Sequence, residues 1–277
     1  MNRKASRFLA YPYIIWMAGF TVIPLLMVFY YGLTDRSGAF TLANILAIGS
    51  SEHLKALWLS LLLAGVSTVI CLVLAYPLAL ILRKRHIGKG SFVVFIFILP
   101  MWMNFLLRTM AWQTLLEKNG VINTFLTLLH LPNVAIINTP AAIILGMVYN
   151  FLPFMVLPIY TVLIKLDRKL IEAAQDLGAP THLVFRRVIF PLSIPGVISG
   201  ITMVFVPSVS TFVISQMLGS GKNLLVGDLI DLQFMGGAYN PHLGSAIALV
   251  MIILIFICMW IMNKFDDGSS EEGGLLL

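Results

Sequence analysis

Long apolar runs, separated by short polar segments, form the main pattern along the chain. Six of them reach the roughly 20 residues that a membrane-spanning helix needs. They lie at about residues 8–33, 56–82, 92–116, 140–164, 192–218 and 243–263. Because lipid cannot hydrogen-bond the backbone, continuous apolar runs of this length form helices. The pattern predicts an all-α membrane protein with six transmembrane helices.

The composition supports this prediction. Hydrophobic residues make up 59% of the 277 residues and charged residues only 11%, whereas ordinary soluble domains carry roughly 25% charged residues. This excludes a soluble enzyme, a disordered chain and a secreted disulfide scaffold. The two cysteines, Cys71 and Cys258, both lie inside apolar runs, so we expect no disulfide.

The distribution of positive charge predicts the orientation in the membrane. The chain has 18 Lys and Arg residues and a formal net charge of +6. Thirteen of the 18 lie at the N-terminus, in the second-to-third and fourth-to-fifth loops, and at Lys264. Cytoplasmic loops carry an excess of Lys and Arg. We therefore expect both termini in the cytoplasm.

Sequence motifs for catalysis are absent. The segment 219–223 lacks both the first glycine and the final hydroxyl residue of a phosphate-binding P-loop. The five histidines have no metal-ligand spacing, and no nucleophile-elbow motif occurs. We expect a non-catalytic protein without metal or cofactor. Any uphill transport would draw its energy from an ion gradient or from another subunit.

The polar segment 165–195 predicts a short amphipathic helix pair. Asp167 suits the N-cap of a helix that begins at Arg168. Gly178 suits a left-handed stop, and Pro180 can open a second turn of helix. An apolar stripe at helical spacing is formed by Leu170, Ala173, Ala174 and Leu177. Such a helix either lies in the lipid headgroup layer or docks on a partner.

A family resemblance bears on this choice. The sequence Glu172-Ala173-Ala174 is separated by three residues from Gly178, which is separated by nine residues from the segment 188–191. This pattern resembles the EAA signature of type I ABC-importer permeases. Val188 and Phe190 replace the family's Ile and Leu, and both remain apolar. The resemblance implies the type I permease fold of the methionine importer. It also implies that Glu172, Ala173, Ala174 and Gly178 contact a cytoplasmic ATPase through a coupling loop at about 165–191.

The resemblance extends along most of the chain. Segments 146–155, 176–179 and 218–234 are similar to the spermidine/putrescine-importer permeases of bacteria, and to the first of the two permease subunits of such systems. This implies a polyamine importer in the plasma (inner) membrane of a bacterium, although permeases for an amino acid, a phosphonate or a metal chelate share the scaffold. The implied partners are a second permease subunit, two copies of an ATP-binding subunit and an extracellular or periplasmic substrate-binding protein. A stand-alone ion-coupled carrier is the alternative from another class.

The implied organisation has three parts. Residues 1–54 form a cytoplasmic stub, the first transmembrane helix and an outer loop. Residues 55–264 form the permease core. Residues 265–277 are acidic and rich in Gly and Ser, which predicts a flexible cytoplasmic tail.

Candidates for a cation pathway come from the residue types that a polyamine requires. Carboxylates can replace its hydration water, and aromatic faces offer cation–π contacts. Asp228 and Asp231 are three residues apart in an outer loop and share one side of a helix; a solvated loop face is the alternative. Within the spans the candidates are Tyr149, Asn150, Phe154, Trp102 and Trp112. For these aromatic residues, bundle packing or an interfacial belt is the alternative.

Arg108 is the one charged residue within the six predicted spans. A charge at the centre of a span costs about 2.5–3.5 kcal/mol on insertion scales. Arg108 therefore either extends to the membrane interface or pairs with an acidic residue of this chain or of the second permease. We do not expect it to bind a polycation.

Overall fold

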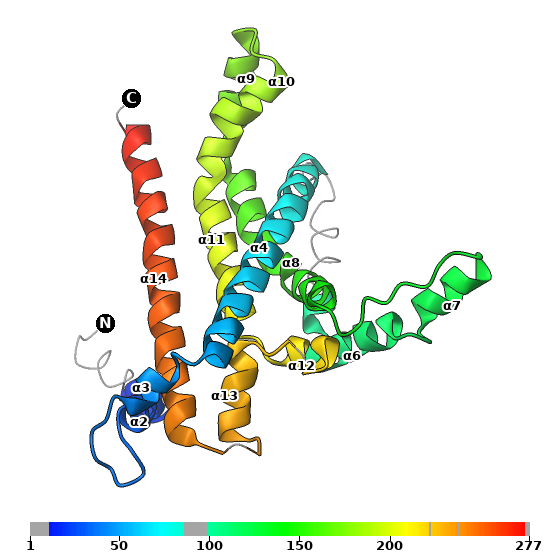
Figure 1. Ribbon diagram of the computed structural model, residues 1–277. Coiled ribbons are helices and arrows are strands. Elements are labelled where there is room, and N and C mark those ends of the chain that lie inside the picture. Colours follow the sequence, from blue (N-terminus) through cyan, green and yellow to red (C-terminus); the bar gives the residue numbers. More distant parts are fainter. Residues whose placement is uncertain (1–10, 86–98, 222, 238, 275–277) are drawn as a thin grey trace.

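The computed structural model describes residues 11–85, 99–221, 223–237 and 239–274, and these residues form helices without a β-strand (Figure 1). Within these described residues, five helical segments are long and apolar enough to cross a membrane. They are Tyr11–Gly32, Ser51–Lys84, Pro140–Lys165, Thr181–Ser210 and Pro241–Met262. Each overlaps one of the predicted spans, which confirms the all-helical membrane architecture.

The chain begins with the helical segment Tyr11–Gly32 and ends with the long helix α14, and shorter helices connect the spans. The elements are η1 (Ala18–Val22), α2 (Ile23–Gly32), α3 (Ala43–Ala47), α4 (Ser51–Arg85), η2 (Leu99–Trp102), α6 (Phe105–Leu116), α7 (Val121–Leu128), α8 (Pro140–Lys165), α9 (Arg168–Asp176), α10 (Thr181–Val184), η3 (Phe185–Ile189), α11 (Phe190–Ser210), α12 (Val213–Gly219), α13 (Val226–Phe234) and α14 (Pro241–Gly274). The η elements are 3-10 or π-helical turns.

The third predicted span is not one continuous helix. Its residues 92–98 lie outside the described residues, and the rest is divided into η2 and α6. Asn104 separates the two because its Oδ1 accepts a hydrogen bond from the Leu106 amide at 2.8 Å. An Asn side chain that bonds local backbone amides favours an N-cap over a helix interior.

The prediction that residues 192–218 form one continuous fifth span is also wrong. α11 ends at Ser210, and Thr211 is extended, with φ −68° and ψ 142°, before α12 begins. The break makes room for the first turn of α13. A Cβ atom built on Gly227 would lie 2.6 Å from the Thr211 carbonyl oxygen, so only glycine fits there. An apolar pattern alone does not reveal such a break.

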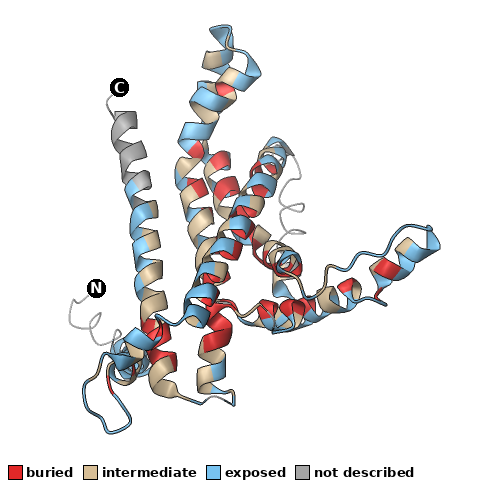
Figure 2. Cartoon of the chain, viewed as in Figure 1, coloured by how far each residue is buried: buried red, intermediate tan, exposed pale blue. Residues whose placement is uncertain are grey.

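The core lies where α4, α8 and α11 pack together, with α6 and α12 against them. Its fully buried side chains include Leu63, Met147, Ile159, Val204 and Leu218. A second, smaller cluster joins α3, α13 and α14 to one end of α4. Figure 2 shows the buried residues at these contacts, whereas α9 and much of α7 are exposed.

Small residues bring α8 and α11 close together. A Cβ on Gly200 would lie 2.7 Å from the Met155 sulfur, and one on Gly196 would lie 3.0 Å from the Pro158 carbonyl oxygen. Small residues let helix backbones approach each other closely. These two glycines therefore serve packing inside this chain.

The two ends of the helical assembly carry different elements. α9 and α10 lie at one end, and α3 and α13 lie at the opposite end (Figure 1). α14 is helical to Gly274, so residues 265–274 continue a helix where the sequence predicted a flexible tail. The predicted cytoplasmic stub, which precedes the first span at residue 8, lies outside the described residues.

Candidate functional site

The predicted coupling helix is present as α9 at one tip of the molecule (Figure 1). None of its residues is buried. Leu170 is 51% exposed and Leu177, just past the helix end, is 89% exposed. The apolar stripe predicted from the sequence is therefore not covered by the described part of this chain.

Both ends of α9 are fixed by local hydrogen bonds. At the start, the Asp167 carboxylate accepts from the Lys169 amide at 3.0 Å. At the end, Gly178 adopts φ +80° and its amide donates to the Gln175 carbonyl at 2.8 Å. The Ala179 amide donates to the Ala174 carbonyl at 3.1 Å. This pair of bonds is the Schellman motif, so the predicted N-cap and left-handed stop are both confirmed.

Two contacts connect the α9 region to the spans. The Arg83 guanidinium of α4 donates to the Leu166 carbonyl, just before α9, at 3.3 Å. Beyond α10, Phe185 and Phe190 pack on the Tyr76 ring of α4, with ring centroids 5.7 and 5.9 Å away. A movement of α9 would therefore act on α4 and on the start of α11.

The residues implied as ATPase contacts have the required accessibility. Glu172, Ala173 and Gly178 are exposed, and Ala174 is partly buried. A Cβ built on Gly178 meets no atom within 4 Å. Glycine at this position therefore serves backbone conformation, because φ near +80° strains other L-residues.

Asp228 and Asp231 lie on α13, as the sequence predicted, but in different environments. The Asp228 side chain is only 2% exposed. Its Oδ2 accepts from the Leu225 amide at 2.7 Å and its Oδ1 lies 2.9 Å from the Ser215 hydroxyl of α12. Asp231 is partly exposed and accepts from the Gln216 side chain at 3.0 Å. Asp228 is thus not on a solvated loop face.

The buried position changes the acidity of Asp228. Burial raises the pKa of its carboxyl from 3.8 to about 6, against the opposing effect of its two hydrogen bonds. The nearby Asp231 charge adds to the increase in the pKa of Asp228.

α13 is also held by α4, because the Val226 amide donates to the Ser60 hydroxyl at 2.8 Å.

The candidates within the spans do not form one site. Trp112 of α6 and Tyr149 of α8 meet edge to face at 5.3 Å between ring centroids, and both line an apolar pocket of about 560 Å³. Asn150 is buried and donates to the Gly146 carbonyl at 2.9 Å. Phe154 lies near Phe151 of the same helix. Trp102 is 75% exposed in η2.

Arg108 does not extend to solvent, because its side chain is 7% exposed. Its Nε and Nη1 are buried and donate to no acceptor among the described residues. Among the described residues the structure shows no ion pair for Arg108. Arg108 and Trp112 are one turn apart on α6, so they share the side of that helix that meets α8.

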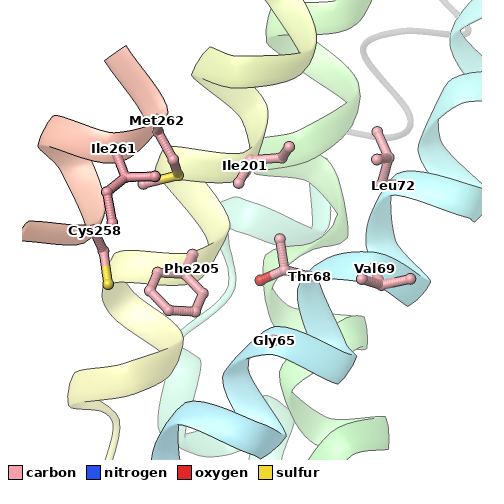
Figure 3. A pocket seen from close by; sticks show the side chains of 9 residues that line it. All are labelled: Gly65, Thr68, Val69, Leu72, Ile201, Phe205, Cys258, Ile261 and Met262. Atoms are coloured by element: carbon pink, nitrogen blue, oxygen red, sulfur yellow. The ribbon is translucent and has the colours of Figure 1, made fainter. Parts of the chain in front are cut away.

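A second hollow of about 340 Å³ lies between α4, α11 and α14 (Figure 3). The hydroxyl of Thr68 in its wall is bonded to the Ala64 carbonyl at 2.7 Å. Phe205, Ile201, Met262 and the other lining residues present hydrocarbon or sulfur. This hollow therefore offers no charged group to a cation. Among the described residues there is also no cluster of metal-ligating side chains.

Sequence reasoning missed the polar residues that hold the outer helix. Ser60, Ser215 and Gln216 lie within apolar runs and are brought to α13 only by packing of distant segments. The signal available in the sequence was the adjacent pair of polar residues, Ser215 and Gln216, inside a predicted span.

Comparisons with known proteins give the family. Residues 75–270 match the family of binding-protein-dependent transport system inner membrane components. The chain is 34% identical over 273 residues to the spermidine/putrescine transport system permease protein PotB of Haemophilus influenzae, covering 95% of both chains. It is 35% identical to PotB of Escherichia coli, covering 92% of this chain and 97% of that protein.

Solved structures give the same fold. A bacterial ABC transporter for import of the acidic polysaccharide alginate contains a chain that superposes with a TM-score of 0.80 at 17% identity, covering 96% of both chains. The MetNI methionine ABC transporter matches with a TM-score of 0.59 at 18% identity, covering 78% of this chain and 95% of that one. The predicted type I ABC-importer permease fold is therefore confirmed. The chain belongs to the family of binding-protein-dependent transport system inner membrane components, which are multi-pass permeases of the inner membrane.

Proposed function

We propose that this chain is the membrane-spanning permease subunit of an ATP-driven importer of polyamines, spermidine and putrescine, and forms half of the translocation pathway. The full-length similarity to two permeases named for these substrates supports the polyamine assignment. The chain itself is non-catalytic, and a partner subunit hydrolyses the ATP.

The observation that carries the proposal is the exposed, doubly capped helix α9. Its uncovered apolar stripe and its Glu172-Ala173-Ala174 segment present a preformed surface for an ATPase. Because α9 is fixed at both ends, it can transmit force as a rigid element. Arg83 of α4 is bonded to the Leu166 carbonyl just before α9, and Tyr76 of α4 packs on Phe185 and Phe190 beyond α10. Closure of the ATPase would thus tilt the spans that form the pathway.

The implied assembly follows from this role. The partners are a second permease subunit, two copies of a cytoplasmic ATP-binding subunit and an extracellular or periplasmic substrate-binding protein. α9 then faces the cytoplasm, as do both termini. α13 faces the outside, at the opposite end of the molecule (Figure 1).

The pathway candidates fall into two groups in this proposal. The first group attracts a polycation at the outer end. It consists of Asp231, which is partly exposed, and of Asp228 when its buried carboxyl is ionised. Trp112 and Tyr149 then offer adjacent aromatic faces deeper in the spans. Asn150 and Phe154 of α8 and Trp102 of η2 are further candidates at separate positions. Such contacts must remain weak, because the cargo also has to leave.

Reconstitution of the complete complex tests the coupling role. The charge reversal Glu172→Lys should reduce transport-coupled ATP hydrolysis and polyamine uptake in proteoliposomes. Glu117→Lys is the matched control, because Glu117 is an exposed acidic residue at the end of α6 away from α9. Both variants should insert normally. Unchanged coupled hydrolysis in Glu172→Lys, or polyamine uptake by the chain without an ATPase, would contradict the proposal.

A further inference from the structure

The outer helix α13 is held by a buried polar cluster around Asp228, whose hydrogen bonds the transport proposal leaves unexplained. Asp228 is contacted by groups from its own cap and from α12, and the neighbouring Val226 amide is bonded to α4. Asp228 and its two serine neighbours Ser215 and Ser60 are each at most 2% exposed. The cluster thus joins three helices at the outer end without access to bulk water.

The direction of the hydrogen bonds in this cluster depends on whether Asp228 carries a proton. The Ser215 hydroxyl lies 2.9 Å from Asp228 Oδ1 and 2.8 Å from the Phe212 carbonyl oxygen, but it has one hydrogen. When Asp228 is protonated, its O–H donates to Ser215 Oγ and the serine donates to Phe212. The Leu225 amide donates to the other carboxyl oxygen. Every polar atom in the chain of bonds then has a partner.

When Asp228 is ionised, the same site holds an uncompensated charge. The Ser215 hydrogen turns toward the carboxylate, which then receives two neutral hydrogen bonds. The positive end of the α13 dipole favours the charge, but a buried charge without a counter-ion is strongly disfavoured. The net result is the raised pKa of Asp228, at about 6.

No cation among the described residues compensates this charge. α13 packs against α4, α11, α12 and α14. α11 and α12 carry no charged residue. The outer end of α4 carries Glu52, His53 and Lys55, and α14 carries His242, whose Nδ1 lies 3.0 Å from the Tyr31 carbonyl oxygen. None of these pairs with Asp228, and the charged group that acts on its titration is Asp231. Lys222 lies outside the described residues.

We propose that Asp228 is a proton-operated latch: its protonated side chain clasps α13 to α12, and its ionised side chain favours release of α13 at the outer end of the permease. The clasp is tight because Gly227 packs directly against the Ser210 and Thr211 carbonyl oxygens. Its role in controlling access for a substrate rests on the proposed function, whereas proton binding itself does not.

The expected pH dependence of α13 release follows from the pKa of Asp228 in the clasped and released states. The pKa of Asp228 is about 6 when clasped, and a solvated Asp carboxyl has the ordinary value of 3.8. If release restores that ordinary value, release becomes about tenfold more favourable between pH 5 and pH 7. Above pH 7 both states are ionised and the dependence levels off. Acidification of the outer medium therefore closes this end.

Thiol labelling of α13 tests the latch without any need for transport. In a chain with Cys71 and Cys258 replaced by alanine, Leu229→Cys reports release, because Leu229 is 8% exposed. Leu232→Cys, which is 37% exposed on the same helix, corrects for the pH dependence of the thiol reaction. The corrected maleimide-labelling rate at position 229 should rise about tenfold from pH 5 to pH 7.

Three variants separate the latch from general loosening. Asp228→Asn keeps both hydrogen bonds, since its amide can donate to Ser215 and accept from Leu225, and it should abolish the pH dependence. Ser215→Ala removes the α12 partner of the protonated Asp228 side chain and should raise the corrected labelling rate at pH 5 above that of the wild type. Asp231→Asn should retain the rise. A corrected rate that is equal at pH 5 and pH 7, or a rise that persists in Asp228→Asn, would overturn the latch. Failure of polyamine uptake alone would instead count against the proposed function.

Discussion

Substitution of Gly178 tests how the end of α9 contributes to coupling. The residue has φ +80°, and a Cβ at this position would meet no atom within 4 Å. Steric conflict with neighbours is therefore excluded, and any effect comes from the backbone. The left-handed conformation costs a non-glycine residue about 1–2 kcal/mol. This reduces the population of the capped loop about 5- to 30-fold relative to its alternatives.

A graded series makes this prediction sharper. Asn tolerates the left-handed region better than Ala does, and a β-branched Val tolerates it least. We expect transport-coupled ATP hydrolysis by the complete complex in nanodiscs to fall in the order Gly, Asn, Ala, Val. Gly65→Ala is the matched control, because Gly65 also has open space around its Cβ but does not have a positive φ.

The outcome that refutes this reasoning is specific. If Gly178→Ala and Gly178→Val assemble normally and hydrolyse ATP at the wild-type coupled rate, the Schellman end of α9 is not needed for coupling. If the three variants lose activity equally, backbone strain is not the cause.

Three further predictions concern stability. Gly227→Ala should lower the free energy of unfolding by about 1–3 kcal/mol, and with it the Tm, because its Cβ would lie 2.6 Å from a main-chain oxygen. Gly19→Ala is the control and should leave the Tm unchanged, because the space around its Cβ is open. Arg108→Met should leave the Tm of the isolated chain unchanged or higher, since two buried nitrogens lose no partner, and a clear decrease would contradict the orphaned state. The raised pKa of Asp228 means that its contribution to stability is fully present below about pH 4 and is lost as the pH rises through about 6. The Tm in detergent should therefore fall between pH 5 and pH 7 more in the wild type than in Asp228→Asn, and equal falls would contradict this.

Local chemistry determined much of this protein from sequence alone. Apolar runs long enough to cross lipid fixed the helical class, because the backbone has no other way to satisfy its polar groups there. The ends of α9 were also predictable, since Asp167 and Gly178 act on backbone groups within a few residues. Family motifs in the same loop indicated a permease before any contact was known.

Tertiary packing decided the features that depend on distant segments. The break after Ser210 exists because α13 packs its Gly227 into that position, and no local signal in the apolar run shows it. Asp228 was predicted as a solvent-facing or pathway carboxylate, yet Ser215 and the α13 cap enclose it. Arg108 is buried although length and position allowed it to reach the interface. The sequence shows which side chains are polar. Their burial and their hydrogen-bond partners depend on helices that come into contact only in the folded chain.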